Sequence, residues 1–83
     1  MPFTDQVTIN NLTIEAGDVV SVYIYDLQGN VVRKLAEQVK ADYSFSGFTW
    51  DGASDAGAIV SKGTYIVSMN RNGKFSSTRI VKQ

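Results

Sequence analysis

The sequence contains no histidine and no cysteine, and these two absences exclude several classes of function. Without cysteine the chain has neither a disulfide framework nor a thiolate metal site. Without histidine it has no imidazole base, so serine-histidine-aspartate, cysteine-histidine and zinc-hydrolase sites are excluded. We therefore expect a protein that is not an enzyme and that needs no cofactor.

A charge surplus and long apolar runs are also missing. The eight lysine and arginine residues balance the eight aspartate and glutamate residues, whereas proteins that bind nucleic acid usually carry a basic surplus. No apolar run approaches the roughly 20 residues that cross a bilayer, so we expect no membrane insertion. The first residues have neither a basic region nor an apolar stretch, so no signal peptide is expected in this chain.

The composition that is present favours β-strands. Valine, isoleucine and threonine together number 22, whereas leucine and glutamate together number five. β-Branched side chains are stiff and suit a pleated surface better than a helix. With 43% apolar residues the chain is expected to fold, and its 83 residues are enough for one domain but too few for two.

Alternation of apolar and polar residues locates the first strands. Residues 7–14 alternate with a slip at residues 10–11, which indicates a bulged strand. In residues 20–25 the aliphatic side chains fall on one face of a strand, and Tyr23 and Tyr25 fall on the other. A tight turn rich in polar residues and glycine follows this strand.

Residues 31–40 are ambiguous. Their apolar residues have helical spacing, but residues 31–35 also read as the strand that follows a hairpin turn. The turn before them requires a pairing partner for residues 20–25, and an isolated helix of about ten residues is marginal in water. We favour a strand followed by a loop.

The second half of the chain predicts two more strand regions. Residues 47–50 alternate, residues 51–57 have the composition of a long turn, and residues 58–60 form a short apolar step. The final hairpin is the best defined, because the Asn-Gly pair at residues 72–73 is the strongest signal for a two-residue turn.

The register of that final hairpin follows from its turn. A two-residue turn sets Arg71 opposite Lys74 and therefore Tyr65 opposite Ile80. Counted together, the segments amount to about seven short strands with no βαβ unit. The sequence predicts an all-β fold, a single antiparallel immunoglobulin-like β-sandwich that spans residues 1–83.

Asp51 and Asp55 are the one candidate for ion binding. Their carboxylates lie in a glycine-flanked loop and could offer oxygens to Ca²⁺. However, Ca²⁺ takes about six to eight oxygens, and the spacing misses the EF-hand pattern. We favour the alternative, in which Asp51 holds a turn by accepting hydrogen bonds from the backbone that follows it.

Tyr23 and Tyr25 are the candidates for a partner patch, because they lie opposite the predicted core face. Aromatic rings on an open face can stack on sugars or contact a protein, whereas the alternative is that they only form cross-strand pairs. Arg33 and Lys34 fall on opposite faces of a strand and form no basic stripe. They favour a solvated strand edge, and no nucleic-acid partner is expected.

A longer series of motifs carries a family resemblance. Residues 22–35 read VYIYDLQGNVVRKL and are followed by TWDG at 49–52, DAG at 55–57 and KGTY at 62–65. This series resembles the immunoglobulin-like domain of the flagellar hook-capping protein. It is also similar to the C-terminal sorting domains of proteins exported by the type IX secretion system of Bacteroidetes.

Three further motifs favour the sorting domain. These are PFTDQVTI at residues 2–9, GTYIV at 63–67 and TRIVKQ at 78–83, the last of which resembles the terminal strand of sorting domains. The fuller loop at residues 50–57 is nearer to the hook-capping type, although hook-capping proteins normally carry this module inside a longer chain.

The sorting-domain resemblance implies a non-catalytic C-terminal domain of a larger protein, which passes through the periplasm and is secreted or held at the cell surface. Its partners would be the outer-membrane secretion machinery and the upstream domains, and we expect a monomer. The resemblance implies recognition through the final hairpin and its exposed edge. The recognition residues would be Gly63, Tyr65, Val67, Arg79, Ile80, Val81 and Lys82.

Two alternatives stay open. The hook-capping resemblance implies an assembly domain instead. An adhesive or glycan-binding spacer that uses Tyr23 and Tyr25 is the other.

Overall fold

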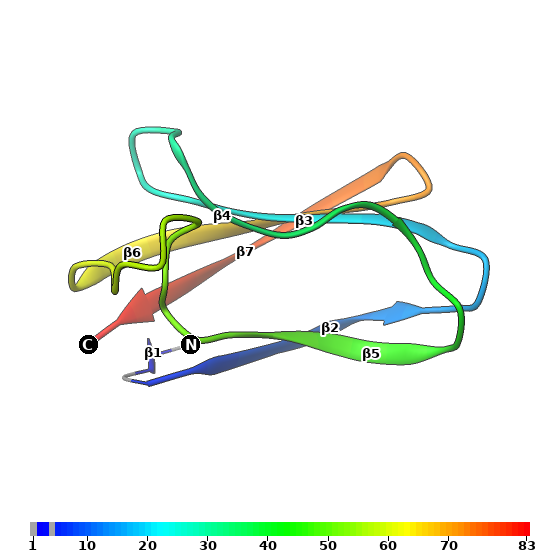
Figure 1. Ribbon diagram of the computed structural model, residues 1–83, viewed down its shortest axis with the longest axis horizontal. Coiled ribbons are helices and arrows are strands. Elements are labelled where there is room, and N and C mark those ends of the chain that lie inside the picture. Colours follow the sequence, from blue (N-terminus) through cyan, green and yellow to red (C-terminus); the bar gives the residue numbers. More distant parts are fainter. Residues whose placement is uncertain (1, 4) are drawn as a thin grey trace.

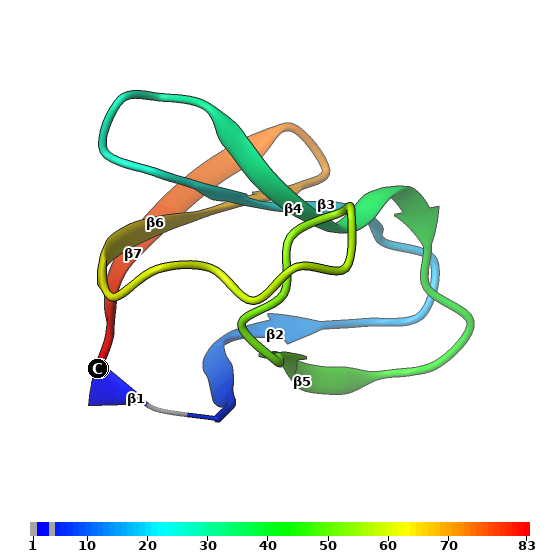
Figure 2. The same ribbon diagram turned by 60° about the vertical axis from the view of Figure 1, so that its left-hand side comes forward.

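Alternating apolar residues bring two β-sheets together face to face (Figures 1 and 2). The computed structural model describes the backbone of residues 2–3 and 5–83 and the side chains of residues 5–9 and 13–83. One sheet has five strands in the order β1-β7-β6-β3-β4, and the other pairs β2 with β5. The strands are β1 (Pro2–Phe3), β2 (Val7–Ile14), β3 (Val19–Tyr25), β4 (Val31–Lys40), β5 (Phe45–Trp50), β6 (Gly63–Arg71) and β7 (Lys74–Lys82).

The predicted all-β sandwich is confirmed, with one exception to its antiparallel pairing. β1 runs parallel to β7, with Pro2 beside Val81 and Phe3 beside Lys82. Figure 2 shows β1 next to the C-terminal end of β7. In the part of the chain that the structure describes, no helix is long and apolar enough to cross a membrane.

The core lies between the two sheets and is built by the predicted alternation. On β3 the three aliphatic residues at positions 20, 22 and 24 point into it, while the residues between them do not. The slip predicted in β2 is confirmed by a register shift between Ile9 and Thr13. The largest fully buried side chains are Trp50, Ile9, Ile14, Ile24, Met69, Ile80, Val22 and Val67.

The prediction for residues 31–40 is half wrong, because the strand continues through Lys40 and no loop follows residue 35. The helical spacing comes from bulges in the β3–β4 ladder. Val20 pairs with Val39 and Val22 pairs with Ala36, so two residues of β3 face three of β4. Each bulge shifts the next core-facing residue of β4 by one position. Core-facing residues that would lie two apart in the sequence then lie three apart.

The apolar step at residues 58–60 does not form a strand. The segment folds back on its own loop: Ser54 N donates to Ala58 O at 2.8 Å, and Val60 N donates to Gly52 O at 2.9 Å. Only an isolated bridge between Ala53 and Ile59 forms. The strand count of seven is reached through β1 instead.

The final hairpin has the predicted register. Arg71 pairs with Lys74 and Tyr65 with Ile80, and the ladder runs without a bulge from the turn to its end. Asn72 and Gly73 both have positive φ, 54° and 88°, as the two-residue turn of a right-twisted hairpin requires. This hairpin is consequently regular along its whole length.

A pair of aromatic residues joins the long loop to the core. Trp50 and Tyr65 have ring centroids 5.6 Å apart at an angle of 70°. Trp50 Nε1 donates to Ala53 O at 2.8 Å, and the Tyr65 hydroxyl donates to Ser61 O at 2.7 Å. Both hydrogen bonds end on the loop between β5 and β6, so the two rings fix its path over the core.

Candidate interaction surfaces

The outer face of the five-stranded sheet carries the tyrosines that the sequence singled out. Figure 1 shows the two-stranded sheet on one side of the five-stranded sheet, and no strand layer of the described chain lies on the other. Tyr23 pairs with Ser68 and Tyr25 with Ile66 across the β3–β6 ladder. Both tyrosines are partly exposed. We call the side chains of Tyr23, Tyr25, Ile66, Ser68 and Asn70 the tyrosine face.

The two tyrosine rings meet edge to face. Their centroids are 6.2 Å apart at an interplanar angle of 88°. The hollow beside them measures about 170 Å³, below the roughly 300–1,000 Å³ of pockets that hold small molecules. A surface of this shape suits a flat contact with a protein better than the enclosure of a small ligand. The hollow is lined by Ser21, Tyr23, Tyr25, Gln38, Ser68, Asn70 and Phe75.

The residues proposed for recognition by a secretion machinery do not form one surface. Tyr65, Val67 and Ile80 are buried in the core, where a partner cannot reach them while the domain is folded. Arg79 and Val81 are exposed, and they project from the face of β7 opposite to Ile80. The other two, Gly63 and Lys82, are partly exposed and pair with each other at the end of the hairpin.

The edge of β7 was expected to be exposed, and the structure corrects this expectation for its last residues. β1 occupies the edge at Val81 and Lys82. From Lys74 to Ile80 the outer edge has no strand partner among the described residues. The free part of the edge therefore lies nearer the Asn-Gly turn than the C-terminal motif.

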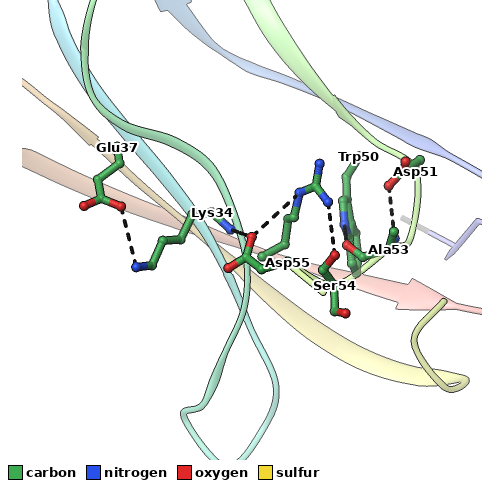
Figure 3. A network of polar contacts seen from close by, with 8 residues as sticks. Lys34, Glu37, Trp50, Asp51, Ala53, Ser54 and Asp55 are labelled. Carbon is green, nitrogen blue, oxygen red and sulfur yellow. Dashed lines mark hydrogen bonds and ion pairs between the residues drawn. The ribbon is translucent and has the colours of Figure 1, made fainter. Parts of the chain in front are cut away.

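The carboxylates of Asp51 and Asp55 accept hydrogen bonds from backbone N–H groups and are not directed at each other (Figure 3). Ala53 N donates to Asp51 Oδ1 at 3.0 Å, which is the turn-holding arrangement favoured for this residue. Lys34 N donates to Asp55 Oδ1, also at 3.0 Å. No cluster of three or more potential metal ligands occurs among the described residues.

The Asp55 contact belongs to a clamp on the edge of β4 that sequence patterns do not reveal. Asp55 N donates to Val32 O at 3.0 Å, in addition to its carboxylate contact with Lys34 N. Arg33 Nη1 donates to Ser54 O at 3.1 Å, and its Nε lies 4.0 Å from Asp55 Oδ1. Arg33 is thus not simply solvated, because the loop covers the β4 edge; among the described residues no loop covers β7 between Lys74 and Ile80 in this way.

Asp18 forms a second polar cluster that the sequence patterns do not reveal. Its Oδ2 accepts hydrogen bonds from Glu15 N at 2.8 Å and Arg71 Nε at 2.7 Å, and its Oδ1 accepts one from Asn72 Nδ2 at 2.8 Å. The hydrogen bond from Glu15 N, then those from Asn72 and Arg71, lower the pKa of Asp18 to about 2. The cluster ties the start of β3 to the β6–β7 turn.

A family model described as the FlgD Ig-like domain matches residues 4–74, most of the 83-residue chain. The chain belongs to the FlgD Ig-like domain family. The comparison with curated proteins and the comparison with solved structures each found no match.

Membership of the FlgD Ig-like domain family confirms the predicted immunoglobulin-like sandwich and supports the hook-capping part of the resemblance. The Tyr65 hydrogen bond fits this assignment, because in immunoglobulin-like sandwiches a tyrosine near the start of a late strand bonds the backbone a few residues upstream. The sorting-domain part of the resemblance has no support from the match. Its most specific motif, residues 78–83, lies beyond the matched residues.

The Asp18 cluster should make the stability of this FlgD Ig-like domain depend on pH in the acid range. A carboxyl whose pKa falls below its ordinary value of 3.8 on folding stabilises the native state above that value. The stabilisation is lost as the pH falls toward about 2. We expect Asp18→Asn to be less stable than the wild type at neutral pH, with a difference that shrinks between those two pH values.

Urea unfolding at a series of pH values measures this difference directly. Asp26, whose pKa is also lowered, chiefly by the hydrogen bond from Asn30 N, contributes equally to both proteins and cancels. A difference that stays constant from neutral pH to pH 2 would show that Asp18 acts without its charge.

Proposed function

We propose that the chain is a non-catalytic assembly domain of the hook-capping type, which binds a protein partner on the tyrosine face. The observation that carries the proposal is a sheet face with two partly exposed tyrosines, which no strand layer of the described chain covers, in a member of the FlgD Ig-like domain family. Tyrosine is enriched at protein interfaces because its ring is apolar and its hydroxyl can still form a hydrogen bond. The small hollow beside the rings favours a protein over a glycan.

The natural probe is the purified flagellar hook subunit, titrated into the isotope-labelled domain and followed by NMR. We expect chemical-shift changes to concentrate on the tyrosine face. If the two rings are central to the interface, Tyr23→Ala with Tyr25→Ala should weaken binding by about 30-fold or more, the effect of losing an interface hot spot.

The matched control lies on the other sheet. Thr8 and Thr49 contact each other through their hydroxyl oxygens at 3.2 Å on the exposed face of the β2–β5 pair. Thr8→Ala should bind the hook subunit as the wild type does. Shift changes centred on β2 and β5, or full binding by the double tyrosine variant, would contradict the proposal.

Export by the type IX system is a second proposal, and its support is the sequence resemblance of residues 78–83 together with the exposure of Arg79. Deleting these residues would be a poor test, because Ile80 is fully buried in the core and its loss would unfold the domain. A better test replaces Arg79 and Lys82 by alanine in a secreted reporter fusion and follows secretion in a type IX-competent host.

The control for that fusion removes the same charge elsewhere, through Lys40→Ala and Lys62→Ala on exposed sites. The proposal expects secretion to be lost only in the Arg79 and Lys82 variant. Equal secretion of both variants would reject it.

A further inference from the structure

The free edge of β7 is a regular template for another strand. The β6–β7 ladder has no bulge, and β7 contains no proline. Its residues at positions 74–77 are all exposed. Natural sheets usually blunt such an edge with a bulge, a proline or a covering loop. The loop of residues 51–57 does this for β4, but nothing in the described chain does it for β7 between residues 74 and 80.

The turn fixes which backbone groups point outward. In a hairpin closed by two residues the closing pair, here Arg71 and Lys74, exchanges backbone hydrogen bonds, and bonded and non-bonded pairs alternate from there. Phe75, Ser77 and Arg79 therefore direct their N–H and C=O groups away from β6. An incoming strand would find these groups unpaired and evenly spaced.

Charge on this hairpin selects the partner. Residues 63–83 contain four basic residues and no aspartate or glutamate, although the whole chain is neutral. Arg71 is paired with Asp18 at 2.7 Å. Lys74 and Arg79, at the two ends of the free edge, have no ion pair within the described part of the chain. Cations without partners on a strand edge attract an incoming strand that carries carboxylates.

The same charges act against a second copy of the chain. Two β7 edges side by side would bring both copies of Lys74 and Arg79 together without any acidic residue between them. This repulsion between like charges disfavours pairing of two β7 edges, while a strand that carries carboxylates can still pair with the edge.

Phe75 supplies an apolar contact for the incoming strand. Its side chain is 76% exposed, the largest exposure among the large apolar residues described. A hollow of about 330 Å³ lies beside it at the hairpin end. An aliphatic side chain directly across from an aromatic one is a favourable cross-strand pair.

We propose that the edge of β7 between Lys74 and Ile80 binds an extended acidic segment of a partner protein as an additional strand. The backbone of Phe75, Ser77 and Arg79 provides the hydrogen bonds, the Phe75 ring provides the apolar contact, and Lys74 and Arg79 select carboxylates. The site uses the backbone edge of β7, whereas the tyrosine face uses side chains of β3 and β6, although Phe75 also lines the hollow beside Tyr23 and Tyr25. Strand addition does not depend on the function proposed for the tyrosine face.

The test uses a hexapeptide, acetyl-Glu-Thr-Val-Thr-Val-Glu-amide. In antiparallel register with its first residue opposite Arg79, its glutamates face Arg79 and Lys74 and a valine faces Phe75. The control peptide has lysine in place of both glutamates. NMR titration with amide hydrogen exchange should show slower exchange at residues 75, 77 and 79 with the acidic peptide, and binding at least about tenfold weaker for the lysine peptide.

Three protein variants sharpen the result. Ser77→Pro removes the central outward N–H and should abolish binding, while Ser77→Ala keeps it and should bind normally. If Ser77→Pro does not fold, the charge reversal Lys74→Glu with Arg79→Glu carries the test, because it should reverse the preference between the two peptides.

The outcomes separate this proposal from the tyrosine-face proposal. The Tyr23→Ala and Tyr25→Ala double variant should still bind the acidic peptide in preference to the lysine peptide and still protect residues 75, 77 and 79, because neither tyrosine supplies an edge group or a charge, although both line the hollow beside Phe75. Loss of peptide binding in that variant, an unchanged preference after charge reversal, or no protection of residues 75, 77 and 79 at millimolar peptide would each overturn strand addition at β7.

Discussion

Trp50→Ala is expected to lower the free energy of unfolding by about 3–5 kcal/mol, the usual cost of truncating a buried large aromatic side chain. The indole is fully buried between the two sheets and packs edge to face on Tyr65. Alanine would leave a cavity there and would remove the donor to Ala53 O. A domain of this length has roughly 4–12 kcal/mol of stability in total, so the variant should be close to unfolding at room temperature.

Circular dichroism in urea is the suitable measurement, because the chain has a single tryptophan and the variant loses its fluorescence signal. Trp50→Phe keeps a ring in the core but leaves Ala53 O without its donor, so an intermediate loss is expected. Tyr43→Ala, at a side chain that is 68% exposed, should change stability by no more than about 0.5 kcal/mol. A loss at Trp50 as small as the loss at Tyr43 would contradict the assigned core.

The fold could be predicted where local chemistry fixes register. In β3 the strict alternation identifies the core face, and it places Tyr23 and Tyr25 on the opposite face without any knowledge of the partner strands. At residues 72–73 the Asn-Gly turn determines which residue faces which along the whole hairpin. Both predictions depend on residues that are close in sequence.

The misassigned end of β4 shows where such patterns fail. Bulges change the spacing of core-facing residues, and a bulged strand then has the same apolar spacing as one face of a helix. Only the pairing of Val20 with Val39 distinguishes the two, and that contact joins different strands. Sequence patterns do not identify β1 for a similar reason, since β1 becomes a strand only through its pairing with β7.

The polar clusters could not be predicted because their members are distant in sequence. Asp55 reaches the backbone of Lys34, 21 residues away, and Asp18 reaches Arg71, 53 residues away. In the sequence both aspartates look like ordinary turn residues. The only sequence signal for a structural role of Asp18 is its place in a turn directly before a buried strand, and this position does not indicate which residues bind its carboxylate.

Tyr65 illustrates how a motif can be assigned to the wrong kind of role. The Gly-x-Tyr motif carries part of the family resemblance, and residues that define a family serve the fold as well as the partner. Burial distinguishes the two roles: Tyr65 is 7% exposed, and its hydroxyl bonds the backbone of its own loop. Of the residues proposed for recognition, a partner can therefore reach only Gly63, Arg79, Val81 and Lys82 while the domain is folded.

Tyr65→Ala is accordingly expected to cost about 3–5 kcal/mol of unfolding free energy, because it removes a buried ring and its contact with Trp50. Tyr65→Phe keeps the ring and loses only the hydrogen bond to Ser61 O, so a loss of about 1–2 kcal/mol is expected. A double-mutant cycle of Tyr65 and Trp50 should give a coupling of about 0.5–1.5 kcal/mol.

The same variants distinguish a structural tyrosine from a recognition residue. Tyr65→Phe should remain folded, bind the acidic hexapeptide at the β7 edge as the wild type does, and unfold at a lower urea concentration. A recognition residue would behave in the opposite way, with unchanged unfolding and impaired partner binding or secretion. That opposite result would indicate that Tyr65 is exposed on the surface of the domain and would contradict its placement beside Trp50.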